Sequence, residues 1–157
     1  MSVVETHPGE VIFIMKAKLV LVAFGIAALG AFTLSAQDEQ TQWDGIYTEA
    51  QARRGSQLYA ENCAACHGEV MLGGEMAPGL IGGEFTTNWN DLSMGDLFER
   101  IQITMPQDNP GSLSSQDNSD VLAYMLQVGQ YPTGEAELPT RIEYLRKYKF
   151  LAMKPSP

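Results

Sequence analysis

The feature that most constrains this chain is the stretch CAACH, residues 63–67. It contains the only two cysteines of the sequence, Cys63 and Cys66, and His67, one of only two histidines. Two thiols three residues apart, followed directly by an imidazole, suit three kinds of chemistry: an exchangeable disulfide, a metal site, or covalent attachment of a haem. The compartment of the protein and the other available ligands distinguish these three.

The first 36 residues have the layout of a secretory signal peptide. Lys16 and Lys18 form a positively charged start, a hydrophobic region spans residues 19–34, and small residues follow it. We expect translation to start at Met15 and cleavage to fall after Ala36, which predicts a periplasmic protein. A retained membrane anchor is the alternative, although the hydrophobic region is shorter than the roughly 20 residues that span a bilayer. No cysteine lies near the cut, which excludes a lipid anchor.

Export would place both cysteines where a disulfide can form. A redox-active pair normally follows a β-strand, however, and the residues before Cys63 have a helical pattern. A structural zinc ion needs four ligands, and after residue 36 the chain has no cysteine or histidine other than Cys63, Cys66 and His67. Zinc would therefore also need a carboxylate. Covalent haem attachment needs this motif alone, because each thiol bonds to the porphyrin and the imidazole binds the iron. We predict one haem c, bound through both cysteines.

With no second histidine available, methionine is the expected sixth iron ligand. The exported part has six methionines: Met71, Met76, Met94, Met105, Met125 and Met153. The first two follow His67 too closely to reach the other porphyrin face easily, and two others fall in helical segments where core packing is expected. Met105 lies 38 residues after His67, between a helix and Pro106, which fixes the loop. We predict Met105 as the second axial ligand.

Hydrophobic periodicity predicts three helices. The first begins near Thr48, where Thr48 and Gln51 have capping-box spacing, and leads into the CAACH motif. Its Gly55 suggests that another helix approaches closely there. The second is expected over residues 93–103 and the third over residues 114–128. The Gly- and Pro-rich stretch between the first two helices, GEVMLGGEMAPGLIGGEF, is expected to lack regular structure and to line a cofactor.

The sequence over residues 48–130 resembles the class I, mono-haem cytochromes c of the bacterial periplasmic type. Besides CAACH, Gly55 and Tyr59 fall where the first helix of that family crosses the last, and Val121 and Tyr124 match the other side of the crossing. The resemblance implies an all-α class I cytochrome c fold, with three main helices wrapped around one covalently bound haem.

The same resemblance implies roles for individual residues. In APGL, the carbonyl group of Pro78 would accept a hydrogen bond from His67, which would orient the imidazole. Leu80 would then pack on the haem. Met105, in TMP, matches the methionine ligand of the family. Trp89 would bond a haem propionate, with plain core packing as the alternative.

Two extensions flank the haem domain: residues 37–47 and residues 131–157. The second has five of the eight basic residues that follow residue 36, and we expect it to include a short basic helix. One apolar face of this helix would consist of Ile142, Leu145, Tyr148 and Ala152. We favour packing on the acidic body of the protein itself over packing on a partner or a membrane.

The net charge limits which classes of partner the protein can bind. Residues 37–139 have 16 acidic and three basic side chains, a net charge of −13. Such a surface does not bind nucleic acid, which needs a basic face, and favours a redox protein with a basic docking face. Membrane contact is expected only through an uncleaved signal segment or the basic C-terminal segment.

These features predict a periplasmic electron carrier and not an enzyme, because no nucleophile–base pair stands out and His67 is committed to iron. The sequence also resembles small cytochromes that accept electrons from quinoprotein dehydrogenases. Two alternatives remain: a five-coordinate haem protein that binds a gas or peroxide, and a haem subunit of a larger dehydrogenase or oxidase.

Overall fold

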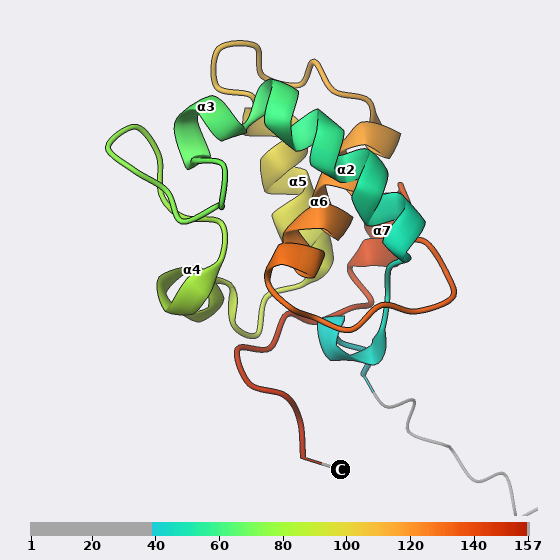
Figure 1. Cartoon of the computed structure of the whole chain (residues 1–157). Coiled ribbons are helices and arrows are strands. Elements are labelled where there is room, and N and C mark those ends of the chain that lie inside the picture. The colour runs from blue at the N-terminus through green and yellow to red at the C-terminus, as the bar shows by residue number, and fades with distance from the viewer. Residues whose placement is uncertain (1–38, 157) are drawn as a thin grey trace, which may run out of the picture. The chain divides into compact units, whose positions relative to one another are not determined.

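The structure, a computed structural model, describes residues 39–156 (Figure 1). The signal segment expected over residues 1–36 lies outside the described residues. The elements in chain order are η1 (Gln42–Asp44), α2 (Glu49–Asn62), α3 (Ala64–His67), α4 (Gly82–Trp89), α5 (Met94–Thr104), α6 (Ser115–Val128) and α7 (Ile142–Leu145). Among the described residues, β-type pairing is limited to two isolated bridges, at Thr41–Lys149 and Ser93–Lys149. The predicted all-α fold is confirmed.

Helices α2 and α6 cross at Gly55, as the sequence predicts. A Cβ atom added at Gly55 would overlap the carbonyl group of Asp120 on α6, so only glycine permits this approach. Next to the contact, the rings of Tyr59 and Tyr124 lie 5.7 Å apart between centroids. Val121 is buried at the same crossing. The two helices run across each other in Figure 1 and form the frame of the domain.

Side-chain caps fix where the helices begin. Ser93 and Asp96 form a capping box at the start of α5, and Ser114 and Asp117 form one at the start of α6. Of the two hydrogen bonds of the capping box expected at the start of α2, only one forms. The Thr48 hydroxyl does accept a hydrogen bond from the backbone of residue 51, but the buried Gln51 side chain points into the core instead of back to the cap.

Helix α4 corrects a second expectation. The Gly- and Pro-rich stretch was expected to lack regular structure, yet its last residues begin α4 (Gly82–Trp89). No side chain caps its N-terminus, but the Thr86 and Thr87 hydroxyls donate to the Gly83 carbonyl over 3.1 and 2.7 Å. Packing also supports the helix, because Phe85 and Trp89 lie one turn apart and contact the hydrophobic core.

The C-terminal extension packs on the protein itself. The helix α7 is one turn long and ends at Leu145, so the expected helical face does not continue to Tyr148 and Ala152. Leu145 and Phe150 are buried, and Arg146 pairs with Glu99 on α5 over 2.8 Å. Residues 39–156 therefore fold as one unit that includes both extensions. Within this unit, no helix combines the length and apolar character that crossing a membrane requires.

Candidate haem-binding site

The CAACH motif lies where α2 ends and α3 begins. Cys63 is the junction: its N–H donates to the Tyr59 carbonyl over 2.9 Å, and its carbonyl accepts from the N–H of His67 over 3.0 Å. Both cysteines are free, with Cys63 half-buried and Cys66 exposed. His67 is buried, at 8% exposure. The single turn of α3 therefore places both thiols and the imidazole within one short, ordered segment.

The environment of Cys63 does not favour thiol–disulfide exchange. Burial raises the pKa of its thiol to about 11, and the neighbouring Cys66 adds to the shift. An exchanging cysteine depends on a lowered thiol pKa, because the thiolate is the reactive form. Among the described residues, no three histidine, cysteine or acidic side chains come together in a way that could hold a metal ion.

The imidazole of His67 is oriented by Pro78. The ring Nδ1 lies 2.8 Å from the Pro78 carbonyl oxygen. Because a carbonyl only accepts hydrogen bonds, Nδ1 must carry the proton, and the lone pair of the neutral ring is then on Nε2. This arrangement leaves Nε2 available to an iron atom.

The loop between His67 and Pro78 is held by its own backbone and by one tyrosine. The Gly73 N–H donates to the His67 carbonyl over 3.0 Å, and the Leu80 N–H donates to the Met71 carbonyl over 2.8 Å. Tyr59 donates its hydroxyl to the carbonyl of Gly68 over 2.6 Å. Burial raises the pKa of Tyr59 to about 12, so the phenol stays protonated and keeps this hydrogen bond. Both sides of the His67–Pro78 contact are thus fixed.

Met105 lies at the C-terminal end of α5, in extended conformation. Its N–H donates to the Ile101 carbonyl over 2.9 Å, and its carbonyl accepts from Gly111 over 3.2 Å, which closes the following loop. The side chain is half-buried. The other methionines divide into buried core residues and exposed ones: Met71, Met94 and Met125 are buried, and Met76 and Met153 are exposed. Met105 as an iron ligand stays a prediction.

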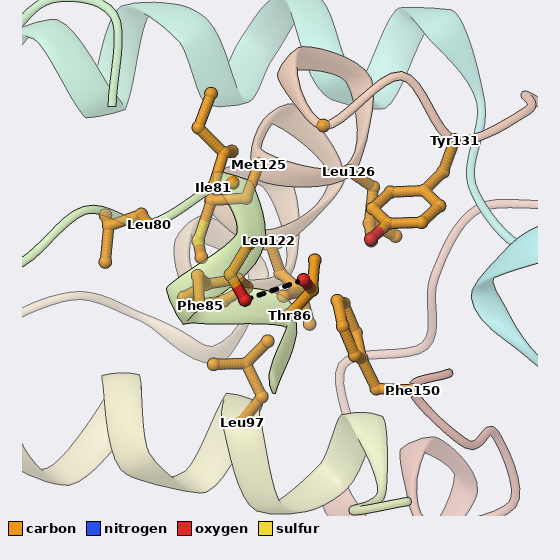
Figure 2. Close-up of a pocket in the computed structure, with 13 residues that line it drawn as sticks. Leu80, Ile81, Phe85, Thr86, Leu97, Leu122, Met125, Leu126, Tyr131 and Phe150 are labelled. Atoms are coloured by element: carbon orange, nitrogen blue, oxygen red, sulfur yellow. Dashed lines mark hydrogen bonds between the residues drawn. The ribbon is translucent and has the colours of Figure 1, made fainter. Parts of the chain in front are cut away.

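An apolar cavity of about 270 Å³ lies between α4, α5, α6 and the C-terminal segment (Figure 2). Leu80, Phe85, Leu97, Met125 and Phe150 are among the residues that line it. Leu80 follows Pro78 by two residues, so the loop that orients His67 also contributes to the cavity wall. The CAACH residues, Met105 and Trp89 do not line the cavity itself.

The residues present fit a haem c. Two free thiols at the required spacing, an imidazole with its Nε2 lone pair available, and an apolar cavity beside the same loop are the features that covalent attachment and burial of a porphyrin need. Phe85 belongs to the Gly- and Pro-rich stretch that was expected to line a cofactor, but sequence reasoning missed Tyr131 and Phe150 as cavity residues. Tyr131 and Phe150 lie beyond the segment with recognisable motifs, and no local pattern signals that they return to this cavity.

Comparisons with known proteins find partial matches to this chain. Residues 50–125 match the family model described as cytochrome c oxidase, cbb3-type, subunit III. The chain is 35% identical over 80 residues to a thiosulfate dehydrogenase of Stutzerimonas stutzeri (strain A1501), a match that covers 46% of this chain and 25% of that protein. The chain thus spans a quarter of the length of this relative.

A structural comparison finds the sulfane dehydrogenase SoxCD of Paracoccus pantotrophus, with a TM-score of 0.47 and 22% identity over 73% of this chain and 62% of that one. The CAACH motif, the all-α fold and the match over residues 50–125 define a c-type cytochrome domain. The family of this domain, the c-type cytochromes, implies covalently bound haem c.

Proposed function

We propose that this chain is a periplasmic electron carrier that binds one haem c through Cys63 and Cys66, with His67 and Met105 as axial ligands. The observation that supports this best is the 2.8 Å contact between His67 Nδ1 and the Pro78 carbonyl, which leaves the lone pair of the neutral ring on Nε2. The bound haem supplies one-electron chemistry by cycling of its iron between Fe(III) and Fe(II).

The surrounding residues would adjust this chemistry. The Pro78 carbonyl fixes the orientation of the His67 ring and increases its basicity. A thioether ligand from Met105 raises the reduction potential, and the apolar side chains of the cavity exclude water. The ring centroid of Trp89 lies 6.1 Å from that of Phe85, and the indole N–H of Trp89 would bond a haem propionate.

The redox partner is proposed to be a protein with a basic docking face. Residues 55–99, which contain the CAACH motif and α4, have seven acidic and no basic side chains. Opposite charges steer the encounter of two redox proteins and set their orientation. The similarity to part of a thiosulfate dehydrogenase supports a dehydrogenase as the electron donor, and a quinoprotein dehydrogenase is one such donor.

Optical spectra of the exported protein test the axial ligands. Oxidised, reduced and carbon monoxide-treated samples of the wild type and of Met105→Ala would be compared, with Met76→Ala as an exposed-methionine control. We expect a sulfur-to-iron charge-transfer band that only Met105→Ala loses, and no carbon monoxide shift in the wild type. A high-spin wild-type spectrum that shifts with carbon monoxide would replace this proposal with the five-coordinate, gas- or peroxide-binding alternative.

A second candidate is a haem subunit of a larger dehydrogenase complex. It is favoured by the match to only a quarter of the thiosulfate dehydrogenase sequence, which shows that such a domain occurs within a longer enzyme. The native mass of the protein in an extract of its own cells separates the two. The mass of a single chain supports the free carrier, and a larger mass that persists at high salt supports the subunit.

A further inference from the structure

We propose that the C-terminal extension of this chain forms one wall of its haem pocket, with Phe150 as a positioning residue for the prosthetic group. This inference rests on the proposed function, because it places the haem against the apolar cavity. The extension lies outside residues 50–125, which match the family model. The wall is therefore a contribution of this chain beyond the matched cytochrome domain.

Phe150 faces the cavity and is shielded from solvent. Its side chain is 1% exposed and lines the cavity together with Leu97 of α5 and Leu122 of α6. Its ring meets the ring of Phe85 edge-on at 5.8 Å and an angle of 89°, and that of Tyr131 at 5.7 Å and 73°. Figure 2 shows the rings of Tyr131 and Phe150 on the side of the cavity opposite Leu80. Aromatic side chains thus close this end of the cavity.

The backbone around Phe150 is fixed on one side by the link between α4 and α5. The Phe150 N–H donates to the Leu92 carbonyl, and the Phe150 carbonyl accepts from the Asp91 N–H, each over 2.8 Å. Two residues earlier, the Tyr148 carbonyl accepts from the N–H of Met94 over 2.8 Å. The extension therefore holds the segment that joins two helices of the cavity wall.

The chain around Phe150 is fixed on its other side by Gln40 and Gln42, which precede α2. Lys149 donates its N–H to the Gln40 carbonyl over 2.8 Å. The fully buried Gln42 side chain bonds both the N–H and the carbonyl of Leu151. Hydrogen bonds on both sides thus fix the backbone at Phe150, and the ring contacts with Phe85 and Tyr131 hold its side chain at the cavity.

A wall of this kind would affect the reduction potential of the haem by keeping water out of the cavity. The apolar shell around a metal site controls solvent access and local dielectric, and through them the reduction potential. Shortening the Phe150 side chain admits water to the cavity. Water stabilises the more highly charged Fe(III) state more than the Fe(II) state, so the reduction potential should fall.

The test measures reduction potential and thermal unfolding of the haem-loaded protein for four variants. Phe150→Ala and Phe150→Val open the wall, Phe150→Leu conserves most of the apolar volume, and Leu145→Ala is the matched control. Leu145 is 0% exposed and belongs to the same extension, but it does not line the cavity. Two opening variants are included so that one folded protein is available even where the other is not recovered.

We expect Phe150→Ala or Phe150→Val to shift the Fe(III)/Fe(II) equilibrium about threefold toward Fe(III), about 28 mV at 59 mV per tenfold change. Phe150→Leu should restore most of the potential, and Leu145→Ala should lower the unfolding temperature without moving the potential. A potential that is unchanged in both opening variants, or shifted as much by Leu145→Ala, would overturn the inference. A wild type that carries no covalent haem would instead refute the proposed function, so the two failures are distinguishable.

Discussion

The helix crossing and the cavity side of this domain are held together in different ways. At the crossing, α2 and α6 are in backbone contact at Gly55, and Arg54 bridges Asp120 and Glu137. On the cavity side, the loop after His67 bonds mainly to itself, and α4 contributes apolar side chains to a cavity wall. The crossing is a scaffold of direct contacts, whereas the cavity side encloses an apolar cavity.

The exposure of side chains to solvent also differs between the helix crossing and the cavity side. Val70, Leu72 and Met76, all in the loop after the CAACH motif, are 63%, 67% and 77% exposed. At the crossing, by contrast, even polar side chains are buried, because Gln51 and Ser119 bond each other and the Leu138 backbone. This contrast predicts that mutations at the crossing change folding stability, while mutations on the cavity side change the properties of the haem.

The largest effect is expected for Gly55→Ala. The new methyl group would overlap the Asp120 backbone, which cannot move as a flexible side chain can. We expect the free energy of unfolding to fall by about 3 kcal/mol or more, measured by denaturant unfolding of the haem-loaded protein. Gly83→Ala in α4 is the control, because a Cβ atom there has no neighbour within 4 Å. It should stabilise the protein slightly, by about 0.5 kcal/mol. An equal decrease in the free energy of unfolding of both variants would contradict the proposed difference between the two regions.

Amide hydrogen exchange measures the contrast without mutation. Amides in the middle of α2 and α6 should exchange only through global unfolding, so their opening free energy should equal the free energy of unfolding. The reason is that these two helices are buried against each other. Those of α4, which has no buried residue and no side-chain cap, should open at a free energy about 2 kcal/mol lower. Equal protection in α4 and α6 would show that the two regions unfold together.

Removal of the Arg54 bridge should have the next largest effect. Arg54 donates to Asp120 over 2.8 and 2.9 Å, and the Asp120 side chain is only 4% exposed. In Arg54→Ala this carboxylate keeps only the hydrogen bond from Gln116. We expect a loss of about 2 kcal/mol, less than for a fully buried pair, because Arg54 itself is 44% exposed.

The neighbouring Arg53 is the matched control for Arg54. Its ion pair with Glu49 is at least 65% exposed on both sides, so Arg53→Ala should cost no more than about 0.5 kcal/mol. Thermal or denaturant unfolding of both variants gives the comparison. A loss in Arg53→Ala that equals the loss in Arg54→Ala would mean that helix propensity, and not the buried carboxylate, sets the effect.

The smallest expected effect is at Asp96, where the extension meets α5. Hydrogen bonds from Ser93 lower the pKa of the Asp96 carboxyl, and Arg146 adds to the shift. Because the folded state then binds the proton less readily, the stabilisation is complete above the ordinary pKa of about 3.9. It is lost as the pH falls through the lower pKa of the folded state. Asp96→Asn should cost about 0.5 kcal/mol at pH 7 and progressively less below pH 4. A constant difference over this range would contradict this explanation.

Much of the scaffold follows from local sequence signals. Serine–aspartate capping pairs set the starts of α5 and α6, and hydrophobic periodicity sets their extent. Gly55, in the interior of a helix, indicated a close helix crossing, and α2 and α6 cross there. The Gln51 side chain did not follow its local pattern, because partners 68 and 87 residues away compete for it.

The cavity side was less predictable, for a physical reason. Helix α4 begins with Gly82 and Gly83, which are poor helix formers, and it depends on packing of Phe85 and Trp89 that no local pattern specifies. The contact of His67 with Pro78 depends on the course of a loop without periodicity, and only the family resemblance suggested it. The return of Phe150 to the cavity depends on backbone pairing with residues nearly 60 positions earlier, which leaves no mark in the sequence.

The central claim is that the cavity side of this chain surrounds a covalently attached haem. The most direct measurement is the intact mass, under denaturing conditions, of the protein exported with a cytochrome c maturation system, compared with a Cys63→Ser/Cys66→Ser variant. We predict that the wild type gains the mass of one haem and has no thiol left to alkylate, and that the variant gains none. A wild type of unmodified mass with two free thiols would contradict this account.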